Sequence, residues 1–257
     1  MKGKTIHTNK KKRKTLYQLF FKRFFDIVLS LLAIIVLSPV MLIVFILHKI
    51  FIRGKFLFKQ YRPGKNGKVF KLYKIRSMTD AVDENGNLLP DNKRLTKFVK
   101  FIRKTSIDEL PQLLNILKGD MSIVGPRPRL VKDMIFYDKR VLEAYTVRPG
   151  LTGLSQVSGG RSNSSWESIF ENDLAYASRI TLFGDIAIIF KTVFTFFKKD
   201  NSSSCAGESK RDYYFADYLL KNEKITREQY EIGLKKAEKI VADGGQVEFQ
   251  KELQGED

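Results

Sequence analysis

The chain has 257 residues, enough to bury a sizeable core in one or two domains. Its formal net charge is +18, and residues 1–76 carry 19 Lys/Arg against one acid, Asp26, whereas the remainder is neutral. A basic block of this kind around an apolar run indicates an anionic membrane surface, and we expect no nucleic-acid partner. The single cysteine, Cys205, excludes an intrachain disulfide framework, and one Cys with two His residues disfavours a structural zinc site.

The first predicted element is an apolar run of 21 uncharged residues, 27–47, about the length that spans a bilayer. Ser38-Pro39 lies near its middle, where proline removes a helix hydrogen bond and the Ser38 hydroxyl is available to a freed carbonyl. Lys/Arg residues flank both ends, which slightly favours a re-entrant helix over a kinked spanning helix. We therefore expect a basic N-terminal tail over 1–23 and a re-entrant membrane helix over 24–53.

The next part of the chain, 54–200, predicts a small domain of the α+β class, mostly helical with short strands. Apolar alternation around turn residues predicts a strand–turn–strand unit over 54–79, and an Asp-, Asn- and Gly-rich stretch predicts a surface loop over 80–93. Helices are then expected near 93–103, from the acid pair at 108–109 to about 118–120, and over 130–145, 166–179 and 182–199. A glycine- and serine-rich loop that offers few core residues is expected at 147–165.

The helix at 182–199 is aromatic and ends in two lysines, so it fits a core helix and an amphipathic interfacial helix equally well. Beyond it, 200–210 has the composition of a linker. Thr226 and Gln229 resemble a capping box that opens a charged helix ending near 243–245. We therefore expect a C-terminal helical extension over 201–257 with few buried positions.

Two adjacent carboxylates, Asp108 and Glu109, stand before a short apolar helix in "SIDELPQ". One interpretation is helix capping, either by Ser106 with Glu109 as a capping box or by Asp108 as the N-cap. The other is chemical. Neighbours on a helix diverge by about 100 degrees, so one carboxylate is suited to attack a phosphorus atom and the other to hold a divalent cation.

Arginines in rigid turns support the chemical interpretation, since the guanidinium fork matches phosphate oxygens. Arg103 lies five residues before Asp108, and Arg127 stands between two prolines in "GPRPR". Arg62 and Arg148 each begin an Arg-Pro-Gly turn. Any one of these is weak evidence, but the combination indicates a phosphate site.

Four blocks, "KRFFDIVLSLLAIIVLSPVMLI", "YRPGKNGKVFKLYKIRSM", "TSIDELPQLLNILKGDMSIVGPRP" and "VRPGLTGLSQVSG", occur in the order seen in bacterial sugar transferases. The chain resembles the monotopic polyprenyl-phosphate phosphoglycosyl transferases of that family over roughly residues 20–200. The resemblance implies transfer of a sugar-1-phosphate from a UDP-sugar to membrane polyprenyl (undecaprenyl) phosphate with release of UMP, which initiates surface polysaccharide or glycoconjugate assembly. It also implies a re-entrant helix broken at Ser38-Pro39.

Carried over by position, the resemblance implies that Asp108 is the nucleophile of a covalent aspartyl-phosphosugar intermediate and that Glu109 is the Mg²⁺ ligand. It implies phosphate-binding roles for four cations and a further acidic site residue in "FENDLAYA": Arg103, Arg127, Lys74, Arg148 and Asp173.

The expected location is the bacterial inner (cytoplasmic) membrane, with the catalytic domain on its cytoplasmic face. The expected partners are a UDP-sugar, polyprenyl phosphate and membrane phospholipids, and the candidate protein partners are a second copy of the chain and downstream glycosyltransferases. The alternative hypothesis is a non-catalytic protein, tethered to anionic lipid or nucleic acid by its basic N-terminal third, in which the acid pair only caps a helix.

Overall fold

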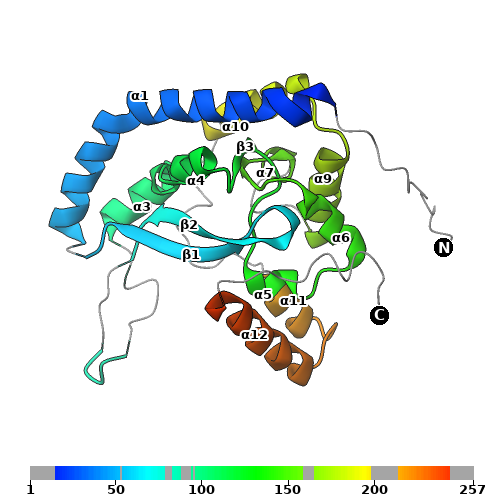
Figure 1. Cartoon of the computed structure of the whole chain (residues 1–257). Helices are drawn as coiled ribbons and strands as arrows, with labels where there is room; N and C mark the ends of the chain where they lie inside the picture. The colour runs from blue at the N-terminus through cyan, green and yellow to red at the C-terminus, as the bar shows by residue number, and fades with distance from the viewer. Residues whose placement is uncertain are drawn as a thin grey trace.

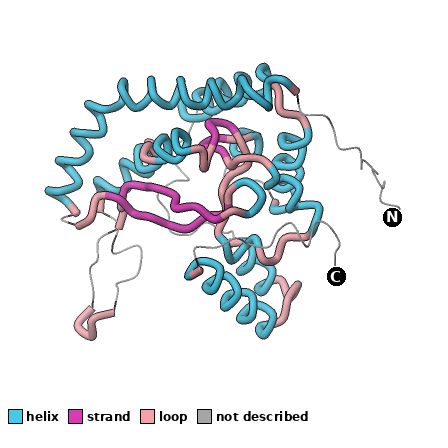
Figure 2. The backbone as a smooth tube through the Cα atoms, viewed as in Figure 1, coloured by secondary structure: helices cyan, strands magenta, loops and turns pink. Residues whose placement is uncertain are grey.

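A computed structural model describes residues 15–52, 54–78, 83–87, 94, 96–158, 165–197 and 214–243. Figure 2 shows two small sheets, with the longest helix on one side of them and the C-terminal helices on the other. The predictions for residues 1–14, for most of the loop at 80–93 and for the linker at 200–210 fall outside the described residues. The mixture of helices and short strands is compatible with the expected α+β class.

Helical structure begins with a short π-helix, Tyr17–Phe21, which continues directly into α1, Lys22–Phe51. It therefore starts inside the segment expected to be a tail. Figure 1 shows α1 as a bent rod that crosses one side of the molecule and then turns toward the start of β1. Pro39 lies inside this helix and gives the physical reason for the bend. The Ser38 hydroxyl donates to the Ile35 carbonyl at 2.8 Å, which is the acceptor that the Pro39 nitrogen leaves unused, as the sequence predicts.

Only one narrow face of α1 is buried, at Asp26, Ser30, Val44 and His48. The helical stretch Tyr17–Phe51 is long and apolar enough to cross a membrane, and only 11% of its most apolar window is buried. A core helix of a soluble domain would bury most of such a window, and a cleaved signal would not pack on the domain through two anchored stretches. The exposed apolar face of α1 is therefore a membrane-facing surface.

The predicted strand–turn–strand unit is an antiparallel hairpin of β1, Leu57–Pro63, and β2, Val69–Ile75. Its tip is a turn of 3₁₀ helix, Lys65–Gly67, in which Asn66 adopts a left-handed conformation with φ of 55°. Gly64 precedes the tip, and a Cβ there would lie 2.9 Å from the Lys68 carbonyl oxygen. The Arg-Pro-Gly and Asn-Gly residues therefore serve the turn chemistry that the sequence indicates.

Helix α3, Lys97–Lys104, is capped by the Thr96 hydroxyl. A 3₁₀ turn, η3, Ile107–Glu109, carries the acid pair and leads into α4, Gln112–Lys118, which ends at Gly119 with φ of 93°. Leu113 and Ile116 of α4 pack against β2, with Ala33 and Ile34 of α1 on the same cluster. The acid pair is thus held in a turn between two helices under the membrane-facing helix.

The stretch 147–165 was predicted to be a loop, and this prediction is wrong for its first half. Strand β4, Gly150–Thr152, pairs in parallel with β3, Ser122–Val124, and α7, Leu154–Ser158, follows it. The glycines permit a close backbone approach, because a Cβ at Gly150 would lie 2.1 Å from the Gly125 nitrogen. Glycine enrichment here marks tight strand packing rather than an irregular loop.

The predicted helix at 130–145 is instead two short helices, α5, Val131–Met134, and α6, Lys139–Glu143, followed by a 3₁₀ turn at Ala144–Thr146. The predicted helix at 166–179 is α9, Trp166–Ser178, with Ser165 as its N-cap. Their facing sides form the largest core cluster, which is rich in aromatic residues: Met134, Tyr137, Val141, Leu142, Ala144, Tyr145, Trp166 and Phe170.

Helix α10, Leu182–Phe197, buries Asp185 and Ile188 but exposes Phe183, Phe190 and Phe194. Tyr17 of the π-helix and Ile188 of α10 belong to one cluster, and Figure 1 shows α10 beside the first part of α1. An exposed aromatic face next to α1 favours the interfacial alternative over the core alternative for this helix.

The C-terminal extension contains α11, Phe215–Lys221, which the sequence did not indicate, and α12, Arg227–Ala242, whose Thr226–Gln229 capping box is confirmed. Phe215 packs on Tyr137, Trp166 and Phe170. Gly233 of α12 lies against Phe136, where an added Cβ would approach the ring to 2.3 Å. The described part of the extension is therefore packed against α5 and the aromatic core.

Candidate active site

The two carboxylates of the acid pair are both buried, with exposed fractions of 8% for Asp108 and 9% for Glu109. Ser106 holds a left-handed conformation with φ of 55°, and its side chain makes no capping hydrogen bond. The N-cap position of α4 is Pro111, also without a side-chain cap. Both capping interpretations are therefore wrong, and the pair occupies a strained 3₁₀ turn.

Glu109 is held by two cations. Its Oε1 accepts from Lys74 Nζ at 3.1 Å and from Arg127 Nη2 at 3.0 Å. Burial lowers the pKa of Lys74, while the nearby charges of Glu109 and Asp108 act in the opposite direction. The structure thus places four of the predicted site residues in one cluster: Lys74, Asp108, Glu109 and Arg127.

Each member of this cluster comes from a rigid element. Lys74 stands on β2, paired with Phe58 across the hairpin. Arg127 follows β3 between Pro126 and Pro128, both buried. The acid turn is fixed by α4, whose Asn115 accepts from the Tyr73 N–H and donates to the Lys71 carbonyl. A short helix, a hairpin and a proline-bounded turn therefore converge on the carboxylates.

Arg103 lies in the last turn of α3, which packs against the acid turn. No hydrogen bond or ion pair from Arg103 to Asp108 or Glu109 is present among the described contacts. Its side chain is half-buried at the edge of the cluster rather than inside it.

Arg148 lies elsewhere. Its Nε donates to the Gly119 carbonyl at 2.9 Å, at the C-terminal end of α4. The acid pair precedes the opposite end, and seven helical residues separate the two ends by about 10 Å. The structure therefore does not bring Arg148 to the acid pair.

Two half-buried arginines lie beside Arg127: Arg62, which the sequence grouped with the rigid arginine turns, and Arg129, which was not predicted. Burial first, and repulsion from Arg127 and Arg129 second, lower the pKa of Arg62 to about 10. Arg62 Nη1 donates to the Pro128 carbonyl at 3.3 Å, and Arg129 stacks on Trp166 at 5.1 Å. The repeated Arg-Pro dipeptides were the available signal, because guanidinium groups held by prolines are suited to phosphate oxygens.

Asp173 of α9 is completely buried, and neither of its carboxylate oxygens meets a hydrogen-bond donor among the described residues. Burial raises the pKa of Asp173 to about 6, although Arg129 and Ser155 favour its ionised form. It therefore lies beside Arg129 rather than in the acid cluster.

Asp26 is a further residue that sequence reasoning missed. Its Oδ1 accepts from the Ser122 hydroxyl at 3.0 Å and from the Ile123 N–H at 2.9 Å. It thereby fastens α1 to β3. The signal was present, because Asp26 is the only acid in the first 76 residues and adjoins an apolar run.

The acid pair fits a Mg²⁺ ion but not a closed protein cage. Within the described ranges, no group of three His, Cys, Asp or Glu side chains is arranged to hold a metal. Magnesium is commonly bound by one or two carboxylates together with substrate phosphates. The donor set of Asp108 and Glu109 meets that requirement.

Comparison with known proteins shows the family. Residues 17–199 match the family described as bacterial sugar transferase, and the chain belongs to it. The match includes α1, the acid turn and α10 and ends before α11 and α12. The hypothesis of a non-catalytic tether is not supported by this membership.

Three relatives illustrate how similar this chain is to known proteins. The Bacillus subtilis protein named uncharacterized sugar transferase EpsL is 45% identical over 68% of this chain and 86% of its own length. The Klebsiella pneumoniae UDP-glucose:undecaprenyl-phosphate glucose-1-phosphate transferase is 40% identical over 68% of this chain and 39% of its own. The Salmonella typhimurium undecaprenyl-phosphate galactose phosphotransferase is 38% identical over 71% and 42%. The chain thus spans less than half the length of the two relatives with named activities.

Proposed function

We propose that this enzyme transfers a sugar-1-phosphate from a UDP-sugar to a membrane polyprenyl phosphate, of the undecaprenyl type, and releases UMP. The product, a polyprenyl diphosphosugar, would initiate assembly of a surface polysaccharide or glycoconjugate. The names of the Klebsiella and Salmonella relatives support this reaction class. Proteins named for exopolysaccharide production are also about 40% identical to this chain, which supports the pathway.

The observation that carries the proposal is a pair of adjacent, buried carboxylates whose second member is held by Lys74 and Arg127. The pair lies beneath a helix whose apolar face is exposed. Such a site combines a carboxylate nucleophile, phosphate-binding cations and contact with a lipid phase.

The reaction proceeds in two displacements. A carboxylate oxygen of Asp108 attacks the phosphorus that bears the sugar, the bond from that phosphorus to the UMP oxygen breaks, and UMP leaves with the electron pair. An oxygen of the polyprenyl phosphate then attacks the same phosphorus, and the Asp108 carboxylate is restored. Carboxylates act in this way in other covalent phosphoryl transfers.

Lys74, Arg62 and Arg127 reduce the electrostatic cost of the first displacement. Two like charges at 4 Å repel by about 4 kcal/mol at an effective dielectric near 20. Since about 1.4 kcal/mol is tenfold in rate, uncompensated repulsion would slow the attack by about a thousandfold. Glu109 pairs with Lys74 and Arg127 and so keeps these two cations oriented toward the UDP-sugar.

A Mg²⁺ ion held by Glu109, with the donor phosphates completing its coordination, would supply further positive charge at the pyrophosphate. The two carboxylates then have separate duties, with Asp108 bonding to phosphorus and Glu109 holding cations.

The test is Asp108→Asn, which keeps the size of the side chain and removes its charge. We expect UMP release from a UDP-sugar to fall by at least about a thousandfold, on the scale of losing a nucleophile. Wild-type enzyme given the donor without acceptor should gain sugar-phosphate mass on the peptide that contains Asp108. Full UMP release by the variant would eliminate the covalent role.

We also propose that α1 is re-entrant, so that the catalytic domain and the start of the chain share the cytoplasmic face of the inner membrane. Residues 22–38 and 39–51 would form arms of about 25 Å and 20 Å, both shorter than the hydrocarbon core of about 30 Å. Basic residues at both ends support this topology.

The topology is tested in a chain whose native cysteine is removed by Cys205→Ser. Thr15→Cys and Lys55→Cys place single thiols at exposed positions on the two flanks of α1. We expect an impermeant reagent to label both from the cytoplasmic side only. Labelling from opposite sides would show a spanning helix.

A further inference from the structure

The C-terminal extension, α11 and α12, lies outside residues 17–199, which match the family. Even so, it contacts both parts of the chain that carry the arginines of the candidate site. One is the hairpin of β1 and β2, which carries Arg62. The other is the segment 126–129 between β3 and α5, which carries Arg127 and Arg129. We call residues 126–129 the arginine turn.

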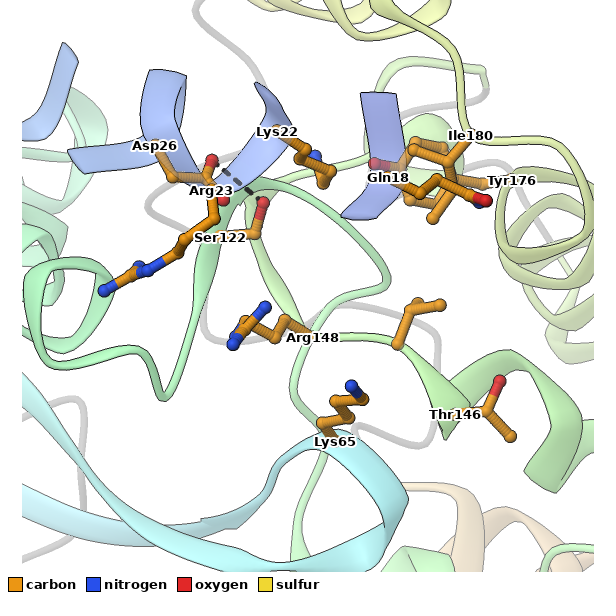
Figure 3. Close-up of a pocket in the computed structure, with 11 residues that line it drawn as sticks. Gln18, Lys22, Arg23, Asp26, Lys65, Ser122, Thr146, Arg148, Tyr176 and Ile180 are labelled. Atoms are coloured by element: carbon orange, nitrogen blue, oxygen red, sulfur yellow. Dashed lines mark hydrogen bonds between the residues drawn. The ribbon is translucent and has the colours of Figure 1, made fainter. Parts of the chain in front are cut away.

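The start of the arginine turn is held by the part of the chain that matches the family. Figure 3 shows Asp26 of α1 meeting the hydroxyl of Ser122, on β3 shortly before the turn. The Pro126 carbonyl then accepts from the Gly150 N–H of β4 at 2.9 Å. The two parallel strands and α1 therefore fix the backbone as far as Pro126.

The end of the arginine turn is held through side chains. The Pro128 carbonyl accepts from Arg62 Nη1 at 3.3 Å, and the Arg129 guanidinium stacks on the ring of Trp166 at 5.1 Å. A shift of Trp166 therefore acts on Arg129. Proline has a fixed φ and also restricts the residue before it, so a shift of Arg129 is passed through Pro128 to Arg127.

Phe215 of α11 packs on the ring that Arg129 stacks on. Its ring centroid lies 5.3 Å from that of Trp166, 5.1 Å from Phe170 and 5.4 Å from Tyr137. Aromatic contacts of this kind stabilise beyond the area that they bury. The extension therefore supplies part of the packing that keeps Trp166 in place.

A buried acid joins α11 to α5. Asp133 of α5 accepts from the Ala216 N–H at 3.2 Å, and both residues are buried. Burial raises the pKa of Asp133, while the Ala216 N–H and then the charges of neighbouring cations act in the opposite direction. Asp217 adds an ion pair with Lys132 at 2.8 Å. Helix α11 is thus fastened to the helix that follows the arginine turn in the chain.

Helix α12 connects α5 with the hairpin. Ala237 forms a buried cluster with Val131 of α5 and Val69 of β2. Val69 directly precedes Phe70, which is the register partner of Arg62 across the hairpin. The extension therefore touches both arginine-bearing parts of the chain and holds them relative to each other.

We propose that the C-terminal extension is a positioning element of the candidate site. By fixing Trp166, α5 and the hairpin, it holds the end of the arginine turn and so keeps Arg127 where it pairs with Glu109. This inference rests on the proposed function, in which Arg127 binds the diphosphate of the UDP-sugar. A displaced extension would leave the carboxylates in their turn but would misplace a phosphate-binding donor, and a small misplacement of that kind is costly to the rate.

Two variants of the full chain displace the extension in different ways. Phe215→Leu removes the ring beside Trp166 but keeps an apolar side chain. Gly233→Ala adds a methyl group that meets the Phe136 ring, while alanine favours α12 as a helix. Lys235→Ala introduces the same residue type at an exposed position of α12 and is the matched control.

Trp166 is the only tryptophan of the chain, so its fluorescence reports the displacement directly. We expect its emission to shift to the red and its quenching by acrylamide to increase in Phe215→Leu, and to a smaller extent in Gly233→Ala, since the wild-type ring is buried. Unchanged emission and quenching in both variants would show that the extension does not hold Trp166 and would overturn the proposal.

A double-mutant cycle with Arg127→Gln, read as kcat/KM for the UDP-sugar, separates positioning from folding. We expect each extension variant to lower kcat/KM by about 10- to 100-fold in an otherwise wild-type chain. In the Arg127→Gln chain the further loss should be below about threefold, because the group that is displaced is already absent. Lys235→Ala should match its parent in both cases.

Two results of the cycle would overturn the positioning role. Equal losses in the two backgrounds would show that the variants only reduce the folded fraction. Full activity together with an altered Trp166 signal would show that the arginine turn does not depend on the extension.

Failure of the proposed function is recognised separately, because wild-type protein would then release no UMP from any UDP-sugar. In that case the affinity for inorganic pyrophosphate replaces the rate in the same cycle. A lack of pyrophosphate binding by wild type, or equal losses of affinity in the two backgrounds, would overturn the positioning role as well.

Discussion

Glu109 and Asp173 are both buried carboxylates, but they differ in the donors that reach their oxygens. Glu109 accepts from two cations at about 3 Å, whereas Asp173 has no hydrogen-bond donor on either oxygen among the described residues. Lys74 and Arg127 offset the negative charge of Glu109 directly, whereas burial raises the pKa of Asp173 to about 6. The comparison shows that burial alone does not define a reactive acid, because the nearest donors decide its charge.

Within this comparison, the largest effect is expected from Arg127→Gln, which removes a cation that pairs with Glu109. Removal of the guanidinium takes one of the two ion pairs described for Glu109 and withdraws a donor from the proposed pyrophosphate site. We expect UMP release to fall by about 10²- to 10³-fold, as when one preorganised donor is lost. Initial rates of UMP release from a UDP-sugar measure this.

The conservative variant Arg127→Lys keeps the charge and should lose less activity. Arg140→Gln is the control, since it removes an arginine that pairs with Glu171 on the surface. Equal losses in Arg127→Gln and Arg140→Gln would contradict the assignment.

An intermediate effect is expected from Asp173→Asn. Because the folded pKa of about 6 exceeds the unfolded value near 3.9, the unfolded chain releases this proton first. Wild-type stability therefore falls as the pH rises from about 4 through 6, and the neutral variant escapes that loss. We expect the stability of the variant relative to wild type to increase by about 2 kcal/mol between about pH 4.5 and pH 7, at 1.36 kcal/mol per pKa unit.

Denaturant titrations in detergent micelles at the two pH values measure this difference. Glu171→Gln, on the exposed side of the same helix, is the control. A difference between Asp173→Asn and wild type that does not change with pH would show that Asp173 keeps an ordinary pKa.

The smallest effect is expected from Ser155→Ala, which sharpens the comparison. The Ser155 hydroxyl favours the ionised form of Asp173, so its removal should raise the pKa of Asp173 further. Because the hydroxyl lies near the carboxylate without a full hydrogen bond, we expect a loss below about 1 kcal/mol in the free energy of unfolding at pH 7. The loss should diminish below about pH 4, where Asp173 is protonated in both folded and unfolded chains, and an unchanged loss there would argue against this coupling.

The features that the sequence predicted correctly depend on a few neighbouring residues. Ser38 and Pro39 act within one helical turn, and the Thr226 capping box is complete within four residues. The hairpin over β1 and β2 is similarly local, since its turn residues lie between its strands. Local chemistry of this kind can be recognised without knowledge of the fold.

The features that were missed depend on contacts between distant segments. Strand β4 exists because β3 lies beside it, and glycine is needed there for close approach, so its composition resembles that of a loop. The position of Arg148 follows from Gly119, 29 residues away. The isolation of Asp173 depends on which donors fail to reach it, and no spacing in the sequence encodes that.

The bend in α1 has a mechanical consequence. A straight helix in a membrane is free to spin about its own axis, whereas a rod with two non-collinear arms resists such rotation. Asp26 fastens one arm to β3, and Val44 and His48 bury the other against the domain. Helix α10 lies beside the first part of α1 and adds a third apolar surface. The domain that carries the acid turn is thereby held in one orientation relative to both arms of α1.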